Sequence, residues 1–242
     1  MRAFIHAFQG RPWNEECKAA CDGFAELGIE TILFTTNEEL DRRHRDDVVV
    51  GGMLIMEHAL RQYGITPPIY DHPDELTEMT GRRIWKVKMG DLTKETLQIF
   101  IKPVREKAAQ GIVVRTWDDI KGYKGIEPDE WICCSEPVSF ISEWRCFVRY
   151  GDILGIRHYN GDPKVYCDMS IIERATELYT SAPAAYALDV GMTDDGRTLL
   201  VEVNDGYAVG CYGLPNVLYA KFLTARWAEL VGIVDPLDDR KL

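Results

Sequence analysis

The chain of 242 residues is 46% hydrophobic and 28% charged, and its formal net charge at pH 7 is −11. This composition is typical of a globular protein with one large domain or two small ones. No segment approaches the ~20 apolar residues that span a membrane, and the first ten residues lack the layout of a signal peptide. The acidic charge, without a long block of one sign, argues against a dedicated nucleic-acid surface. The seven cysteines include no CxxC pair, which favours reduced thiols and a cytoplasmic protein.

Residues 1–80 alternate short apolar runs with segments of helical periodicity. Apolar positions from Trp13 to Leu27 recur at helical spacing, and Gly28 follows as a stop. A second helical pattern begins after Gly51-Gly52. This alternation predicts a small α/β domain with parallel strand pairing. The predicted strands span residues 2–8, 31–34, 48–50 and 69–70, and the predicted helices span residues 13–27 and 51–63.

The glycine pair Gly51-Gly52 has two interpretations. The free N–H groups of a helix N-terminus can bind an anion. A glycine pair in this position is also typical of a tight turn, and the sequence leaves both interpretations open.

Residues 71–82 form a polar connector that marks a domain boundary. Beyond it, two apolar strands flank a short polar loop, residues 105–110. Lys102 lies inside the first of these strands, where lysine is rarely buried without an anionic partner such as a phosphate. Alternatively, the strand lies at a sheet edge, with Lys102 pointing outward and Pro103 ending the pairing.

Two hairpins and two helices are expected in the last part of the chain. Alternating apolar residues predict one hairpin over residues 141–159, with its turn at Tyr150-Gly151-Asp152. A second hairpin is expected to turn at Asp194-Asp195-Gly196. The predicted helices span residues 168–181, with Asp168 as the cap, and residues 215–231, with Pro215 near the first turn.

The second hairpin carries three oxygen-bearing side chains. Glu202 and Asn204 are two residues apart and so point to the same face of their strand. Asp189 lies near the place where the opposite strand pairs back. Oxygen ligands without Cys or His suit Mg²⁺ or Mn²⁺, and such ions usually also bind substrate phosphates. The alternative interpretation is a hairpin with a solvated acidic face.

The order of these motifs resembles the ATP-grasp superfamily. The ordered set is FIKP, SEPV, E-W-R-x-F-V, A-L-D-V-G and V-E-V-N, and the resemblance covers about residues 85–220. The short chain and the EWR motif are most similar to the compact clade of small ATP-grasp carboxylate–amine (peptide) ligases. The resemblance implies an α/β (α+β) fold in which two α+β lobes clasp ATP, preceded by a small parallel α/β domain. The implied domains are residues 1–80 for the small domain, 81–136 for the N-terminal lobe and 137–242 for the C-terminal lobe with the metal site.

The resemblance also implies a role for each matching residue. Lys102 would neutralise the phosphate charge of ATP, and Glu143 would accept the ribose hydroxyls. Asp189 and Glu202 would hold one Mg²⁺ (or Mn²⁺), and Glu202 would bridge to a second ion that Asn204 also holds. Backbone groups of a hinge would pair with the adenine edge, and this hinge consists of Glu136, Pro137, Val138 and Ser139.

The lysines depart in part from the family pattern. The loop after Lys102, our candidate lid, is not Gly-rich, and Lys107 is the residue that could partly replace the missing glycines there. The family's earlier lysine would be Lys86 or Lys88, although both lie closer to Lys102 along the chain than the pattern predicts.

The implied activity is ATP-dependent ligation. A carboxylate attacks the γ-phosphate to give an acyl phosphate and ADP, and an amine then displaces phosphate to form an amide. Some ligases of the family carry an arginine two residues before the metal-binding aspartate, and this chain has none there. We therefore expect Arg145 or Arg157 to stabilise the anion during catalysis. The expected partner is a small molecule or peptide with a carboxylate and an amine, and an oligomer is compatible with the sequence. Two alternatives stay open: a phosphotransferase (kinase) on the same fold, and a nucleotide-binding module without activity.

Overall fold

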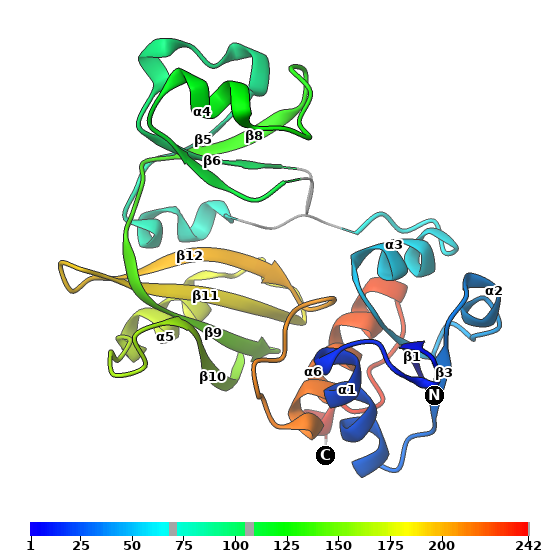
Figure 1. The fold of residues 1–242 in the computed structure, drawn as a ribbon. Coiled ribbons are helices and arrows are strands. Elements are labelled where there is room, and N and C mark those ends of the chain that lie inside the picture. The colour runs from blue at the N-terminus through cyan, green and yellow to red at the C-terminus, as the bar shows by residue number, and fades with distance from the viewer. Residues whose placement is uncertain (68–71, 105–108, 242) are drawn as a thin grey trace. The chain divides into compact units, whose positions relative to one another are not determined.

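The computed structural model describes residues 1–67, 72–104 and 109–241 (Figure 1). The chain forms two compact units. Unit 1 consists of Met1–Met79 together with Ile141–Leu242, and unit 2 consists of Thr80–Phe140. The first and third predicted domains thus contribute to one compact unit. The strand predicted at residues 69–70 lies outside the described residues.

A parallel sheet forms the N-terminal part of unit 1. β1 (Ala3–Phe8) lies between β3 (Thr31–Phe34) and β4 (Val48–Val50) and pairs in parallel with both. α1 (Glu15–Glu26) begins after Asn14, whose side chain accepts a hydrogen bond from a backbone N–H of the first turn. The predicted strands up to residue 50, their parallel pairing and both predicted helices are confirmed. The other elements here are β2 (Arg11–Pro12), α2 (Asn37–Leu40) and α3 (Met53–Arg61).

The C-terminal helix α6 (Asn216–Val231) packs against α1. The helices approach closely at Gly23, where an added Cβ would lie 2.0 Å from the backbone oxygen of Asn216. Glycine is therefore required at this position, because the backbones of α1 and α6 approach each other closely there.

Replacement of Gly23 by alanine is expected to lower the free energy of unfolding by about 1–3 kcal/mol, because the helices must move apart. Urea denaturation of both proteins measures this difference. Gly122→Ala is the matched control, since an added Cβ at this helical glycine meets no atom within 4 Å. Equal losses at both positions would contradict the packing argument.

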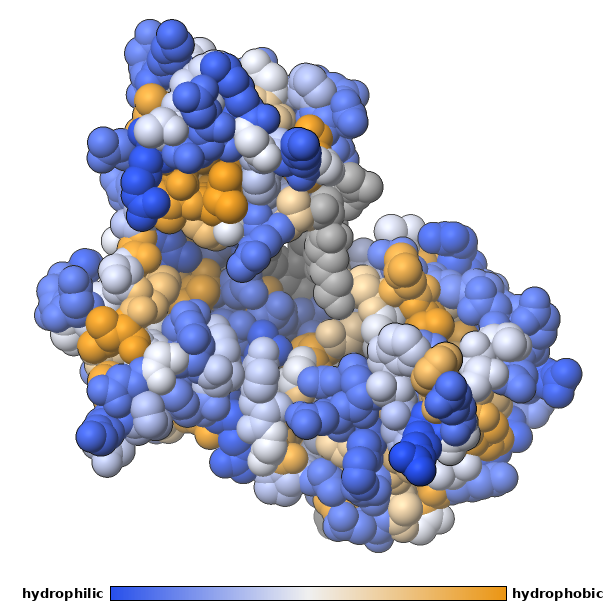
Figure 2. Space-filling view, in the orientation of Figure 1, coloured by the Kyte–Doolittle hydropathy of each residue, from blue (hydrophilic) through white to orange (hydrophobic). Residues whose placement is uncertain are grey.

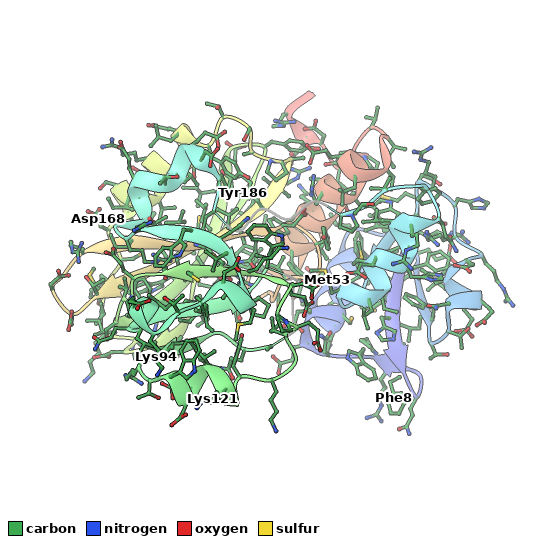
Figure 3. All side chains as sticks on the ribbon, turned by 90° about the horizontal axis from the view of Figure 1, so that it is seen from above. Phe8, Met53, Lys94, Lys121, Asp168 and Tyr186 are labelled. Carbon is green, nitrogen blue, oxygen red and sulfur yellow. The ribbon has the colours of Figure 1, made fainter. Side chains whose placement is uncertain are left out.

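The second sheet of unit 1 has four strands in the order β10-β9-β11-β12 and contains both predicted hairpins. Tyr150 and Gly151 have φ angles of 52° and 85°, which suit a two-residue hairpin turn. α5 (Met169–Leu178), capped by Asp168 as predicted, packs with Tyr186 and the other buried apolar residues of one sheet face (Figure 3). The strands are β9 (Phe140–Arg149), β10 (Asp152–Gly161), β11 (Ala185–Thr193) and β12 (Thr198–Asp205).

Unit 2 contains a four-stranded sheet in the order β5-β8-β6-β7, with antiparallel neighbours. Because β6 lies between β8 and β7, the alternative that Lys102 belongs to an edge strand is wrong. Ile101, Ile132 and Cys134 lie in the apolar core of this unit. The elements are β5 (Ile84–Lys88), β6 (Ile99–Pro103), β7 (Ile112–Val114), α4 (Trp117–Gly122) and β8 (Trp131–Ser135).

Short 3-10 helices complete the described elements: η1 (Asp74–Thr80), η2 (Met89–Asp91), η3 (Lys94–Thr96) and η4 (Asp239–Lys241). All seven cysteines are free, as predicted. The face shown in Figure 2 is mainly hydrophilic, with hydrophobic residues in separate patches. In the part of the chain that the structure describes, no helix has both the length and the apolar character needed to cross a membrane.

Asp47 is a buried carboxylate that ties the start of β1 to the segment before β4. It accepts hydrogen bonds from the backbone N–H of Arg2 at 2.8 Å, from Nη2 of Arg2 at 2.6 Å and from the backbone N–H of His44 at 2.8 Å. Burial by itself would raise the pKa of Asp47, but the bonds from Arg2 and His44 outweigh it and lower the pKa. Asp47 therefore stabilises the fold through its charged form.

We expect Asp47→Asn to lower the free energy of unfolding at pH 7 by about 1–3 kcal/mol, the cost of weakened buried hydrogen bonds. The stabilisation by Asp47 is present above the pKa of the unfolded chain, about 3.9, and is lost as the pH falls through the lower folded pKa. The difference in stability should therefore begin to shrink below about pH 4 and close only below the pKa of Asp47 in the folded protein. Urea denaturation between pH 7 and pH 3 tests this, and a difference that is independent of pH would contradict it.

Candidate active site

Asp189 and Glu202 face each other across the β11/β12 hairpin as cross-strand partners. Asn204 lies two residues beyond Glu202 on the same sheet face. Its Nδ2 donates hydrogen bonds to Asp189 Oδ2 at 3.1 Å and to Glu202 Oε1 at 3.3 Å. The three side chains thus converge on one sheet face, and their role as metal ligands stays a prediction.

A bulge in β12 lies directly beside this group. Asp189 pairs with Glu202, whereas Val190 pairs with Leu200, so Val201 is an extra residue. A bulge locally bends the strand and redirects side chains, and bulges often occur beside functional sites. The sequence analysis missed it, because the alternation of apolar residues does not mark an inserted position.

Asp189 is paired with Arg145 of β9 in a two-pronged ion pair. Arg145 Nε lies 2.7 Å from Asp189 Oδ1, and Arg145 Nη2 lies 2.6 Å from Oδ2. Both residues are buried, with exposed fractions of 8% for Arg145 and 2% for Asp189. Burial raises the pKa of Asp189 to about 6; the bonds from Arg145 oppose this shift, and the charges of Glu202 and Glu143 add to it. Such a charge-assisted pair fixes the orientation of both side chains.

Two stacked tyrosines lie beside the guanidinium of Arg145. Its Cζ lies 5.0 Å from the ring centroid of Tyr212 and 5.9 Å from that of Tyr159, and the two rings stack 5.0 Å apart. Tyr159 also donates its hydroxyl to Glu143 Oε2 at 2.9 Å, and Asn160 Nδ2 donates to the other oxygen at 2.7 Å. Burial raises the pKa of Tyr159, which keeps the hydroxyl a donor. Both oxygens of Glu143 therefore have protein partners.

The sequence analysis missed Tyr159, Asn160 and Tyr212 as site residues. Asn160 is the cross-strand partner of Glu143, but two register shifts in β10 lie between this pair and the turn. Counting pairs outward from the predicted turn therefore leads to His158 instead. Tyr212 lies in the loop between β12 and α6 with a φ angle of 42°, and no periodicity points to it.

Arg157 of β10 is the direct cross-strand partner of Arg145. Like charges in this position are destabilising unless an anion compensates them. Arg145 has Asp189 as its partner, whereas the buried Nε of Arg157 has no hydrogen-bond partner among residues 1–67, 72–104 and 109–241. A buried donor without a partner is costly, so Arg157 is the better placed of the two arginines to receive an anionic ligand.

The donor set is small for a metal site. Within the described ranges, no group of three or more His, Cys, Asp or Glu residues is arranged to hold an ion. Asp189, Glu202 and Asn204 supply two carboxylates and one amide, a set of hard oxygen donors. Mg²⁺ commonly uses one or two carboxylates and completes its shell with water and substrate phosphates. The donors therefore fit a magnesium ion that binds together with a nucleotide.

Three lysines share one face of the sheet in unit 2. Cys133 of β8 pairs with Lys86 on one side and with Lys102 on the other, so both lysines point to the same face. Two strand spacings place their Cα atoms about 10 Å apart. Lys88 lies two residues after Lys86 on this face, opposite Trp131. Lys86 lies closer to Lys102 along the chain than the family pattern predicts. Strand pairing nevertheless places the two lysines in one row across the sheet, on either side of Cys133.

The predicted hinge follows directly after β8. The backbone N–H of Glu136 donates to the backbone oxygen of Arg83 at 3.2 Å, and the Glu136 carboxylate accepts the backbone N–H of Arg83 at 3.0 Å. Glu136 is thereby tied to the residue before β5. Pro137, Val138 and Ser139 continue without regular structure to β9.

The predicted site residues thus form two groups. Glu143, Arg145, Arg157, Asp189, Glu202 and Asn204 belong to the second sheet of unit 1. The lysines of β5 and β6 and the hinge belong to unit 2. Lys107 and most of the candidate lid lie outside the described residues.

A family model of the ATP-grasp domain, R2K clade family 2, matches residues 79–222. The chain belongs to this ATP-grasp family. The match includes all of unit 2 and the sheet that carries Asp189, Glu202 and Asn204, which confirms the resemblance inferred from the order of motifs. A comparison with curated proteins finds no significant match.

Solved ATP-grasp structures share the fold over most of the chain, which confirms the predicted fold class. D-alanine–D-alanine ligase from Bacillus anthracis complexed with ATP is 13% identical, with a TM-score of 0.58 and coverage of 95% of this chain and 96% of the ligase. Macrocyclase MdnC from Microcystis aeruginosa, bound with precursor peptide MdnA, is 15% identical, with a TM-score of 0.50 and coverage of 96% and 100%. ATP-grasp ligase PsnB complexed with minimal precursor, Mg and ADP is 10% identical, with a TM-score of 0.54 and coverage of 93% and 96%.

Proposed function

We propose that this ATP-grasp protein is an ATP- and Mg²⁺-dependent carboxylate–amine ligase that forms an amide bond through an acyl phosphate. One observation carries the proposal: a single sheet face of unit 1 presents Asp189, Glu202 and Asn204 beside two arginines. Ligation needs both kinds of group, oxygen ligands for the cations of ATP and arginine for the anion that forms. Structural relatives that act as ligases, some bound to precursor peptides, support this reaction class.

For ATP binding, we assign the phosphates to the lysine face of unit 2. Lys102 lies on β6, and Lys86 and Lys88 lie on β5. We also assign Lys107 to the phosphates; it follows β6 along the sequence. The backbone of residues 136–139 would hold the adenine, and Glu143 would accept the ribose hydroxyls in place of a present partner. Asp189, Glu202 and Asn204 would hold the divalent cations, which offset charge on the phosphoryl group when they are bound.

The protein side of the reaction is positioning and charge stabilisation. The substrate carboxylate forms a bond to the γ-phosphorus of ATP as the bond to ADP breaks, and the amine later forms the C–N bond as phosphate and a proton leave. Arg157 supplies guanidinium donors to the acyl phosphate. No side chain has to act as a nucleophile, and water must be excluded from the acyl phosphate, because water would hydrolyse it.

An ¹⁸O-labelled carboxylate substrate tests the reaction class. ATP turnover is first screened over amino acids and peptides, with mass detection of products. In a ligase, one labelled oxygen leaves the carboxylate with the released phosphate, and phosphate appears only when an amine is present. A phosphorylated product that keeps the label would show a kinase, and no phosphate release with any substrate pair would show a binding module. Either result contradicts the proposal.

A further inference from the structure

Arg145 already uses the carboxylate that we assign to the metal. Both oxygens of Asp189 accept a guanidinium N–H from Arg145, at 2.7 Å and 2.6 Å, and Oδ2 accepts a third hydrogen bond from Asn204. The pair is buried, so water does not screen it. A divalent cation on the same oxygens would meet a guanidinium positive charge at contact distance. Three of the roughly four lone-pair sites of the carboxylate are thus occupied, and the ion pair opposes binding of a cation to the same oxygens.

The hydrogen bonds of Asn204 also oppose cation binding. It directs its Nδ2 donor at both Asp189 and Glu202. To ligate a cation it must present the carbonyl oxygen instead, which requires a half-turn of the amide. Cation binding thus changes the partners of Arg145 and of Asn204 together.

We propose that Arg145 and the divalent cation compete for Asp189, so that cation binding releases the Arg145 guanidinium for the anionic substrate. Arg145 first acts as a positioning residue, because its two hydrogen bonds hold Asp189 in place. Once displaced, it lies on the sheet face directly across from Arg157, so two arginines become available to one anion. The inference rests on the proposed function for the identity of the cation.

The chain offers a matched control for this competition. Arg157 carries the same charge on the same face, one strand from Arg145, but no hydrogen bond to Asp189 is present in the described chain. Arg145→Gln removes a positive charge and also the guanidinium that is hydrogen-bonded to Asp189. Arg157→Gln removes only a charge. A purely electrostatic effect on the cation would appear in both variants, whereas competition appears in Arg145→Gln alone.

Mn²⁺ binding without nucleotide measures the competition directly. Free Mn²⁺ is followed by electron paramagnetic resonance with the wild-type protein and both variants, and a circular dichroism spectrum and thermal melt check the fold of each. We expect Arg145→Gln to bind Mn²⁺ roughly tenfold or more tightly than the wild type, the equivalent of one hydrogen bond to a charged group. Arg157→Gln should change the affinity by a clearly smaller factor. An Arg145→Gln affinity equal to or weaker than that of the wild type overturns the proposal.

The ¹H–¹⁵N signal of Arg145 Nε gives a second measurement on the unmodified protein, assigned by its absence in Arg145→Lys. Addition of Mg²⁺ and a non-hydrolysable ATP analogue should shift or broaden this signal, because its bond to Asp189 is lost. A signal that does not change while Mg²⁺ binds overturns the proposal. Because the wild-type protein is observed, this test remains valid even if Arg145→Gln does not fold. Neither measurement depends on turnover, so the two proposals can fail separately. If the protein fails the ligase test but shows competition for Mn²⁺, the proposed function is wrong and the competition stands.

Discussion

Replacement of Glu202 by glutamine is expected to abolish ATP turnover while leaving the fold intact. Glu202 is the proposed bridge between the two cations, so loss of its charge weakens both. Glutamine has the same size, and its Oε1 can still accept the 3.3 Å hydrogen bond from Asn204. We expect turnover below about one-hundredth of the wild-type rate, since even indirect partners of metal ligands are worth 10–100-fold. Steady-state phosphate release and a thermal melt of the variant measure the two effects.

A matched control lies on the other side of the same sheet. Glu173 is exposed on α5, which packs on the face opposite Glu202, so Glu173→Gln removes one negative charge without touching the site. This control should keep wild-type turnover. Calorimetry with and without Mg²⁺ completes the test, because ATP binding should require the cation. Tight ATP binding without metal, or a fully active Glu202→Gln protein, would refute the assignment of the metal site.

Replacement of Lys102 by alanine should weaken ATP binding by roughly 1.5–3 kcal/mol, the range for a hydrogen bond to a charged group. Lys102 lies on an interior strand, in the same row as Lys86 and on the same face as Lys88. Three cations on one face favour a polyanionic ligand such as a nucleotide phosphate chain. Titration with a non-hydrolysable ATP analogue in the presence of Mg²⁺ measures the loss.

Lys121→Ala serves as the control in the same unit. Lys121 is exposed on α4 and pairs with Asp118 at 2.9 Å, away from the row of Lys86 and Lys102. It removes the same charge from unit 2 and should leave the affinity unchanged. An equal loss of ATP affinity in both variants would show that Lys102 acts only through the overall charge of the protein. Unchanged affinity in both variants would show that Lys102 does not contact the phosphates.

The local elements of this protein follow from short-range patterns in the sequence. The caps at Asn14 and Asp168, the turn at Tyr150-Gly151 and the helix after Pro215 each depend on residues a few positions apart. Such features depend on backbone conformation and neighbouring side chains, so the sequence alone predicts them. The tight turns set the register of the strand pairs next to them. Counted from the turns, Arg145 would lie opposite Ile156 and Asp189 opposite Val201. One bulge in each hairpin shifts these pairings to Arg157 and Glu202.

Other features depend on contacts between distant parts of the chain. The row of Lys86 and Lys102 exists because β8, far along the chain, lies between β5 and β6. The bulge at Val201 and the position of Tyr212 depend in the same way on the packing around them. No local pattern encodes which strands become neighbours.

The order of motifs in the sequence was thus enough to identify the ATP-grasp family and the two hairpins, whereas the roles of the site residues stay predictions. Only the tertiary structure decided how those residues are paired. Arg145 and Asp189 are 44 positions apart, and they meet because β9 lies beside β11. A buried ion pair forms only where two strands bring opposite charges together out of water, and that depends on strand order and register rather than on spacing along the chain.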